Sequence, residues 1–216
     1  DSQTTFAGTI FARGGDTSGN GGFVEVSGKR DLNFAGTVDT RAPNGLTGTL
    51  LLDPDDSIID VTAASTIVGN LSTTSVVIST SAAGTGGNGD ITVNAPVTWS
   101  GSNSLTLSAY RDIAVNANIT NTTGGAAVTL RADNTGTGVG TVSFGAGIQI
   151  STAGAVSIFY NPTSYTAPTS YGGNVTGGAA LTASMLVNTF TNLQAVGTNT
   201  TTLGGTYALG KDVNAD

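Results

Sequence analysis

Short apolar pairs recur along the chain, and a single polar or small residue separates the two members of each pair. Strict alternation of apolar and polar residues over such short stretches predicts half-buried β-strands. The pairs are Val24 and Val26, Leu50 and Leu52, Val76 and Ile78, Leu105 and Leu107, Val128 and Leu130, and Val156 and Ile158. Their first members lie 26, 26, 29, 23 and 28 residues apart. A period in this range is typical of stacked structural repeats.

Two further short strands follow the apolar pair within each period. The second strand is expected at Asp31–Phe34, Ser57–Val61, Asp90–Val93, Asp112–Val115 and Thr141–Phe144, and the third around Val38, Ile67, Val97, Ile119 and Ile148. Three strands in about 26 residues predict an all-β fold, a three-sided parallel β-helix of about five to six coils over residues 1–158. A β-sandwich needs longer strands, and propeller repeats are longer than this period. We expect the Gly-rich segments Ser81–Gly89 and Ala132–Gly140 to be protruding corners.

The regular pattern ends after Ile158. Residues 159–180 are rich in Pro, Tyr and Gly and predict a loop or linker. Residues 181–216 predict a short helical segment near 182–195, followed at Asp212 and Val213 by the start of a further coil. We expect this helical segment to cover the apolar end of the last coil, because an open end of stacked strands invites edge-to-edge association.

Composition restricts the chemistry of the 216-residue chain. It contains no Cys and no His, which removes thiolate metal sites and the commonest general base. Its net charge of −7 and its seven scattered Lys and Arg residues argue against nucleic-acid binding. No apolar run is long enough to predict membrane insertion. The absence of Cys with abundant Thr, Asn and Gly favours a secreted, extracellular protein of the bacterial outer surface.

Two segments carry a family resemblance. Gly19–Asp56, GNGGFVEVSGKRDLNFAGTVDTRAPNGLTGTLLLDPDD, resembles a recurrent segment of filamentous-haemagglutinin-like exoproteins of the two-partner secretion family, and Ser170–Asp216 resembles the segment that follows their haemagglutinin repeats. The resemblance implies a rod-shaped, right-handed β-helix that mediates adhesion to cells or surfaces. It also implies an outer-membrane transporter as partner of the full-length protein, and a host-cell or bacterial surface receptor or glycan as target.

Acidic residues supply the candidates for metal binding and catalysis. Asp53, Asp55 and Asp56 could bind Ca²⁺ through carboxylate oxygens, or could form a strand-ending Asp-Pro turn. The run GGNGD, residues 86–90, is one residue short of a calcium-binding repeat. A second set precedes the second strand of several coils: Asp31, Asp90, Asp112 and Asp212. Stacked carboxylates could act as acid and base in a carbohydrate-active enzyme, but Ser57 and Thr141 hold the same place elsewhere, which favours capping of backbone N–H groups.

Aromatic and asparagine residues supply the candidates for ligand binding and modification. Tyr160, Tyr165 and Tyr171 could stack on sugars. Sequons for N-glycosylation occur at Asn70, Asn118, Asn121, Asn174 and Asn199, close to the number that chance predicts for this composition. We therefore expect a non-catalytic structural and adhesive segment without cofactor, with a carbohydrate-active or glycan-binding β-helix domain as the alternative.

Overall fold

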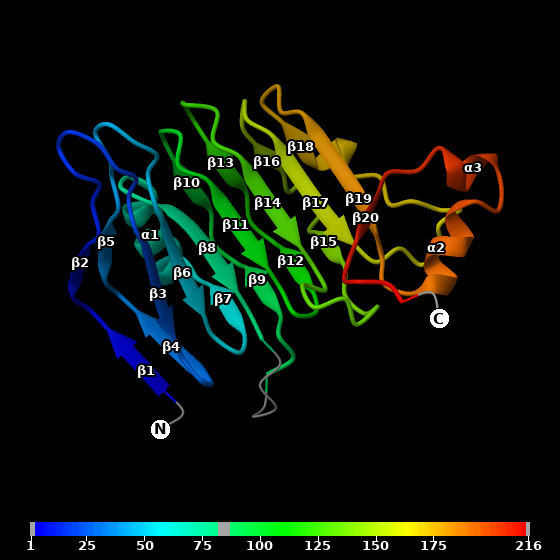
Figure 1. Cartoon of the computed structure of the whole chain (residues 1–216), viewed down its shortest axis with the longest axis horizontal. Helices are drawn as coiled ribbons and strands as arrows, with labels where there is room; N and C mark the ends of the chain where they lie inside the picture. Colours follow the sequence, from blue (N-terminus) through cyan, green and yellow to red (C-terminus); the bar gives the residue numbers. More distant parts are fainter. Residues whose placement is uncertain (1–2, 82–86, 215–216) are drawn as a thin grey trace.

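Parallel β-strands make up most of the structure (Figure 1). The computed structural model describes residues 3–81 and 87–214. Its largest sheet has eight strands in the order β20-β19-β17-β14-β11-β8-β6-β3, all parallel to their neighbours. These strands are β3 (Phe23–Ser27), β6 (Thr49–Asp53), β8 (Ser75–Ser79), β11 (Leu105–Ser108), β14 (Val128–Arg131), β17 (Val156–Tyr160), β19 (Leu181–Val187) and β20 (Tyr207–Leu209).

The expected register of the apolar pairs is confirmed in this sheet. Val24 pairs with Leu50, Leu50 with Val76, and so on through Leu105 and Val128 to Val156. The second members of the pairs are all buried: Val26, Leu52, Ile78, Leu107, Leu130 and Ile158. Stacking them on one face removes a continuous row of aliphatic side chains from water, which is the main source of stability here.

Two four-stranded parallel sheets carry the second and third strands of most repeats. One has the order β15-β12-β9-β7 and the other the order β10-β13-β16-β18. Their strands are β7 (Ser57–Ile59), β9 (Ile91–Val93), β10 (Val97–Trp99), β12 (Ile113–Val115), β13 (Ile119–Asn121), β15 (Val142–Phe144), β16 (Ile150–Ser151) and β18 (Val175–Thr176). From β8 to β16 the chain visits the eight-stranded sheet and these two sheets in strict rotation.

Two short sheets lie at the N-terminal end of the structure. β1 (Gln3–Phe6) pairs with β4 (Asp31–Phe34), and β2 (Thr9–Phe11) pairs with β5 (Thr37–Asp39). Two similar sequences, FAGTI at Phe6–Ile10 and FAGTV at Phe34–Val38, therefore lie side by side. The rings of Phe6 and Phe34 are stacked at 5.8 Å. The expected all-β class with mostly parallel strands is confirmed.

The expectation of a strand around Ile67 is wrong, because Val61–Leu71 form the helix α1. Asp60 caps its N-terminus by accepting a hydrogen bond from the N–H of Ala63. Ala64, Ile67 and Leu71 follow the three- and four-residue spacing of one helical face and are buried. The helix lies where a third strand was expected and contacts both β5 and β10, the edge strands of two different sheets (Figure 1).

The helical segment expected near residues 182–195 begins later than its apolar spacing suggested. Leu181–Val187 continue the eight-stranded sheet as β19, in which Leu181 pairs with Val156 and Met185 with Tyr207. Thr189 caps the helix α2 (Phe190–Val196), and α3 (Thr200–Leu203) follows. Both helices lie at the C-terminal end of the structure, beside β19 and β20 (Figure 1).

The segment expected to be a loop or linker, 159–180, contains regular structure at both ends. Phe159 and Tyr160 belong to β17, and the short 3-10 helix η1 (Gly172–Asn174) leads into β18, which pairs with β16. Asp212 and Val213 lie after the last strand, β20. Of the two Gly-rich corners, residues 82–86 of the first lie outside the described residues.

Candidate functional site

The three acidic residues at the end of β6 differ in burial. Asp53 ends the strand, Asp55 is buried, and Asp56 is exposed at the start of the turn into β7. Burial of Asp53, with the nearby negative charges of Glu25 and Asp55, raises the pKa of that carboxyl. Within residues 3–81 and 87–214, no three acidic side chains converge on a position that could hold a metal ion.

Asp56 is part of a series of carboxylates that connect successive repeats. Its Oδ1 accepts hydrogen bonds from the backbone N–H of Asn88 at 3.0 Å and of Asp90 at 2.8 Å. Asp90 in turn accepts from the N–H of Asp112 at 3.1 Å, and Asp112 accepts from the N–H of Thr141 at 2.8 Å. Each carboxylate thus caps a backbone donor at the corner of the next repeat.

Asp90 is also held by a cation. Arg111 donates to its two oxygens from Nε at 2.9 Å and Nη2 at 2.5 Å. Burial disfavours the charged form of Asp90, but the hydrogen bonds from Arg111 and from the Asp112 N–H, with the positive charge of Arg111, outweigh it and lower the pKa. The lowered pKa favours the ionised form of Asp90, which accepts these hydrogen bonds.

The remaining members of the predicted acidic column lie apart from this series. Asp31 begins β4, with its carboxylate 3.6 Å from the guanidinium of Arg30, and its side chain is about half exposed. Asp212 follows β20. The structure brings together Asp56, Asp90 and Asp112 through backbone donors and leaves Asp31 and Asp212 elsewhere.

Two of the three candidate tyrosines are inside the protein. Tyr160 is 1% and Tyr171 is 3% exposed, and their rings meet edge to face at 5.1 Å. The Tyr171 hydroxyl donates to the carbonyl of Val142 at 2.9 Å, and burial raises the pKa of Tyr171 to about 12. Neither ring has a free face on which a sugar could stack, so Tyr160 and Tyr171 do not support the glycan-stacking hypothesis.

Tyr165 is the candidate tyrosine that remains half-buried at the surface. Its hydroxyl donates to the carbonyl of Leu186 at 2.5 Å, and its ring lies 5.6 Å from that of Tyr207. It lines an open polar groove between the 161–166 segment and the helices α2 and α3, together with Asn192 and Thr198. This groove could offer hydroxyl and amide contacts but only one aromatic ring.

The five sequon asparagines differ in accessibility. Asn70 is 2% and Asn121 is 6% exposed, and both hold backbone groups by hydrogen bonds. Asn118 and Asn199 are exposed and Asn174 is half-buried. Modification of the folded protein is thus sterically open at Asn118 and Asn199 and closed at Asn70 and Asn121.

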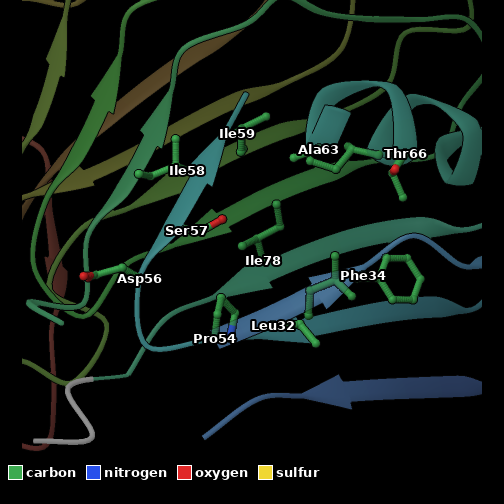
Figure 2. Close-up of a pocket in the computed structure, with 12 residues that line it drawn as sticks. Leu32, Phe34, Pro54, Asp56, Ser57, Ile58, Ile59, Ala63, Thr66 and Ile78 are labelled. Atoms are coloured by element: carbon green, nitrogen blue, oxygen red, sulfur yellow. The ribbon is translucent and has the colours of Figure 1, made fainter. Parts of the chain in front are cut away.

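A partly enclosed cavity lies under α1 and was not predicted from the sequence. Its volume is about 110 Å³, and it lies between β4, β6, β7 and the helix (Figure 2). Apolar side chains form most of its wall: Leu32, Phe34, Leu52, Ile59, Ile67 and Ile78. Asp56, Ser57 and Thr66 add polar atoms to the lining. A shallower groove continues from it past Asp31 and Asp60.

Two buried polar clusters were also missed. Asp39, 6% exposed, is held by the guanidinium groups of Arg13 and Arg41, and the hydrogen bonds from Arg41 keep its pKa well below the usual range despite burial. Asp133, fully buried at a φ of 51°, accepts hydrogen bonds from the amides of Asn161 and Asn188 at 2.9 and 3.1 Å. A sequence shows such residues as polar positions but not the contacts that bury them.

No family model, no curated protein and no solved structure matches this chain. In the described part of the chain, no helix is long and apolar enough to cross a membrane.

Proposed function

We propose that the chain is a non-catalytic, structural and adhesive segment of a secreted bacterial surface adhesin. Its strands would be wound as a right-handed, three-sided parallel β-helix. The rotation of the chain through three parallel sheets supports this winding, and crossovers between parallel strands are nearly always right-handed. The resemblance to filamentous-haemagglutinin-like exoproteins supports the placement on a bacterial surface.

Rows of outward hydroxyl groups carry the proposal of adhesion. In the eight-stranded sheet, one row joins Thr106, Thr129, Ser157 and Thr182, which are register partners on β11, β14, β17 and β19. Neighbouring strands are about 4.8 Å apart, so this row repeats hydroxyl donors and acceptors at a fixed spacing. Many weak hydrogen bonds made at once to a repeating polymer such as a polysaccharide can add up to firm attachment.

The second four-stranded sheet provides a matched control row. It joins Thr98, Thr120, Ser151 and Thr176 on β10, β13, β16 and β18. We expect beads coated with the chain to adhere to cultured cells or polysaccharide-coated glass, and alanine at all four positions of the first row to reduce adhesion at least tenfold. The same exchange in the control row should reduce adhesion less. Equal adhesion by wild type and both row variants would contradict the proposal.

The catalytic alternative has its own test. The carboxylates of Asp56, Asp90 and Asp112 are engaged by backbone N–H groups, which supports a structural role. We expect no depolymerisation of polysaccharides by the purified chain. Turnover that is lost in Asp90→Ala, with folding retained, would replace the adhesive proposal by an enzymatic one.

A further inference from the structure

The row formed by the second strands of the repeats is interrupted between β4 and β7. In the sheets formed by the described residues, β4 pairs with β1 and β7 pairs with β9, but β4 and β7 are not neighbours. The eight-stranded sheet continues across the same junction, because β3 pairs with β6. Two parallel strands therefore present edges to the same gap.

The backbone of β7 directs hydrogen-bonding groups into this gap. On the opposite edge, the Ser57 N–H donates to the carbonyl of Asp90 at 2.9 Å, and the Ile59 carbonyl accepts from the N–H of Asn94 at 2.9 Å. In a parallel ladder, alternate residues direct both backbone groups to the same neighbour. The N–H and C=O of Ile58, between these two residues, must then face away from β9 and toward β4.

The backbone of β4 does the same from the other side. The Ala35 N–H donates to β1 at 2.8 Å, whereas the Arg30 carbonyl accepts from the N–H of Asp55 in the following repeat at 3.3 Å. Odd- and even-numbered residues therefore face opposite neighbours. This alternation directs the N–H and C=O of Leu32 and Phe34 toward β7.

The space between these two edges is a groove whose walls combine apolar side chains with polar groups. The cavity under α1 and the shallower groove beside it share Leu32, Phe34, Ile58 and Ala63 in their walls. Figure 2 shows Leu32 and Phe34 on β4 and Ile58 and Ile59 on β7, on opposite sides of the cavity. Ile58, on the edge of β7, is 65% exposed.

Acidic side chains line the groove. Asp56 lines the cavity, and Asp60 lines the continuing groove together with Asp31, whose charge is offset by Arg30 at 3.6 Å. The hydrogen bonds that Asp56 and Asp60 accept from backbone N–H groups leave their negative charge in place. This acidic rim favours a cationic ligand, and the net charge of −7 on each copy disfavours a second copy of the chain.

We propose that the gap between β4 and β7 binds an extended segment of a partner protein by strand addition. The segment places a small apolar side chain over the cavity and a Lys or Arg beside the acidic rim. Its backbone bonds to Leu32 and Phe34 on one side and to Ile58 on the other, which joins the two-stranded and four-stranded sheets into one. Backbone bonds supply affinity in this mode, and the apolar pocket and charged rim supply specificity.

The test uses a synthetic heptapeptide, Lys-Val-Thr-Val-Thr-Val-Lys, titrated into the folded chain and followed by fluorescence anisotropy and by amide hydrogen exchange. We expect saturable binding and slower exchange at the amides of Leu32, Phe34 and Ile58. A peptide with glutamate in place of both lysines should bind at least tenfold more weakly. Absence of saturable binding up to a peptide concentration of about 1 mM would overturn the proposal.

Two variants locate the site. Ile58→Pro removes the N–H that faces the gap but none of the bonds to β9, and proline is tolerated on edge strands for this reason. We expect it to weaken binding at least tenfold, while the control Ile58→Thr, which keeps the N–H, binds within threefold of wild type.

Ala63→Leu fills the cavity from the helix and changes no residue of either strand, and it should also weaken binding. Peptide binding that neither Ile58→Pro nor Ala63→Leu weakens would overturn the assigned site. Binding to a second copy, seen as self-association without peptide, would overturn the assigned occupant. Neither result bears on the hydroxyl rows, so this proposal and the adhesive one can fail separately.

Discussion

The side-chain amide of Asn70 should contribute more to the stability of the fold than most other polar side chains. Its Oδ1 accepts from the N–H of Val38 at 2.7 Å, and its Nδ2 donates to the carbonyls of Gly36 at 3.0 Å and Thr66 at 2.8 Å. The side chain therefore pairs with the edge of β5 as a strand would, from a residue on α1. It is 2% exposed, so water cannot take over these bonds.

Asn70→Ala should destabilise the protein by about 3 kcal/mol, since it leaves two buried backbone groups unsatisfied at about 1 to 3 kcal/mol each before relaxation. That loss corresponds to a fall in Tm of roughly 6 to 12 °C for a chain of this length. Urea unfolding gives the free energy, and hydrogen exchange should show faster exchange at the Val38 amide.

Two controls separate hydrogen bonding from packing. Asn70→Asp keeps the size of the side chain but places a carboxylate oxygen against the carbonyl of Gly36, so at neutral pH it should be at least as destabilising as alanine. Asn94→Ala removes an exposed amide contact with Asn116 and should change the stability by less than about 0.5 kcal/mol. Equal stability of Asn70→Ala and Asn94→Ala would refute the role assigned to Asn70.

Two further predictions concern the core and the ion pairs. Leu107→Asp buries a charge in the aliphatic row and should cost more than about 4 kcal/mol in urea unfolding, whereas Thr106→Asp, outward on the same strand, should be tolerated. Asp39→Asn should lower stability by about 2 kcal/mol at pH 7. Because the folded-state pKa of Asp39 is lowered, this difference should persist above its ordinary value of 3.8 and shrink as the pH falls below it. A difference that is constant from pH 7 to pH 2 would contradict the assignment.

The sequence predicts the parallel sheets well, because the spacing of the apolar pairs depends on burial alone. Val24, Leu50 and Val76 had to share one face once the period was recognised, and their register follows from that alignment. The acidic column was also informative in part. Asp90 and Asp112 were expected to cap backbone donors, and the structure shows which donors they accept from.

The helix α1 was harder to predict from the sequence, because the segment is rich in β-branched residues that favour strands. The buried residues Ala64, Ile67 and Leu71 have helical spacing, but β-branched neighbours such as Val61, Thr62 and Thr66 make this spacing difficult to recognise. In β19 the reverse happened. Alternation and helical spacing both fit Leu181–Val187, and pairing with β17 decided the outcome. Tertiary contacts overrule local preference in both segments.

The edge of β5 is covered by side chains, whereas the facing edges of β4 and β7 are not. Where α1 replaces a third strand, Asn70 covers the edge of β5, and Thr73 adds a bond from its hydroxyl to the Val38 carbonyl at 2.7 Å. Elsewhere, Asp56, Asp90 and Asp112 give backbone donors at the corners a side-chain partner. The edges of β4 and β7 differ, because apolar side chains and a cavity lie between them. Exposed edges that are neither paired nor covered are sites where another strand can add. Backbone groups at the other junctions described above have side-chain hydrogen-bond partners. We therefore expect a partner strand to bind in the gap between β4 and β7.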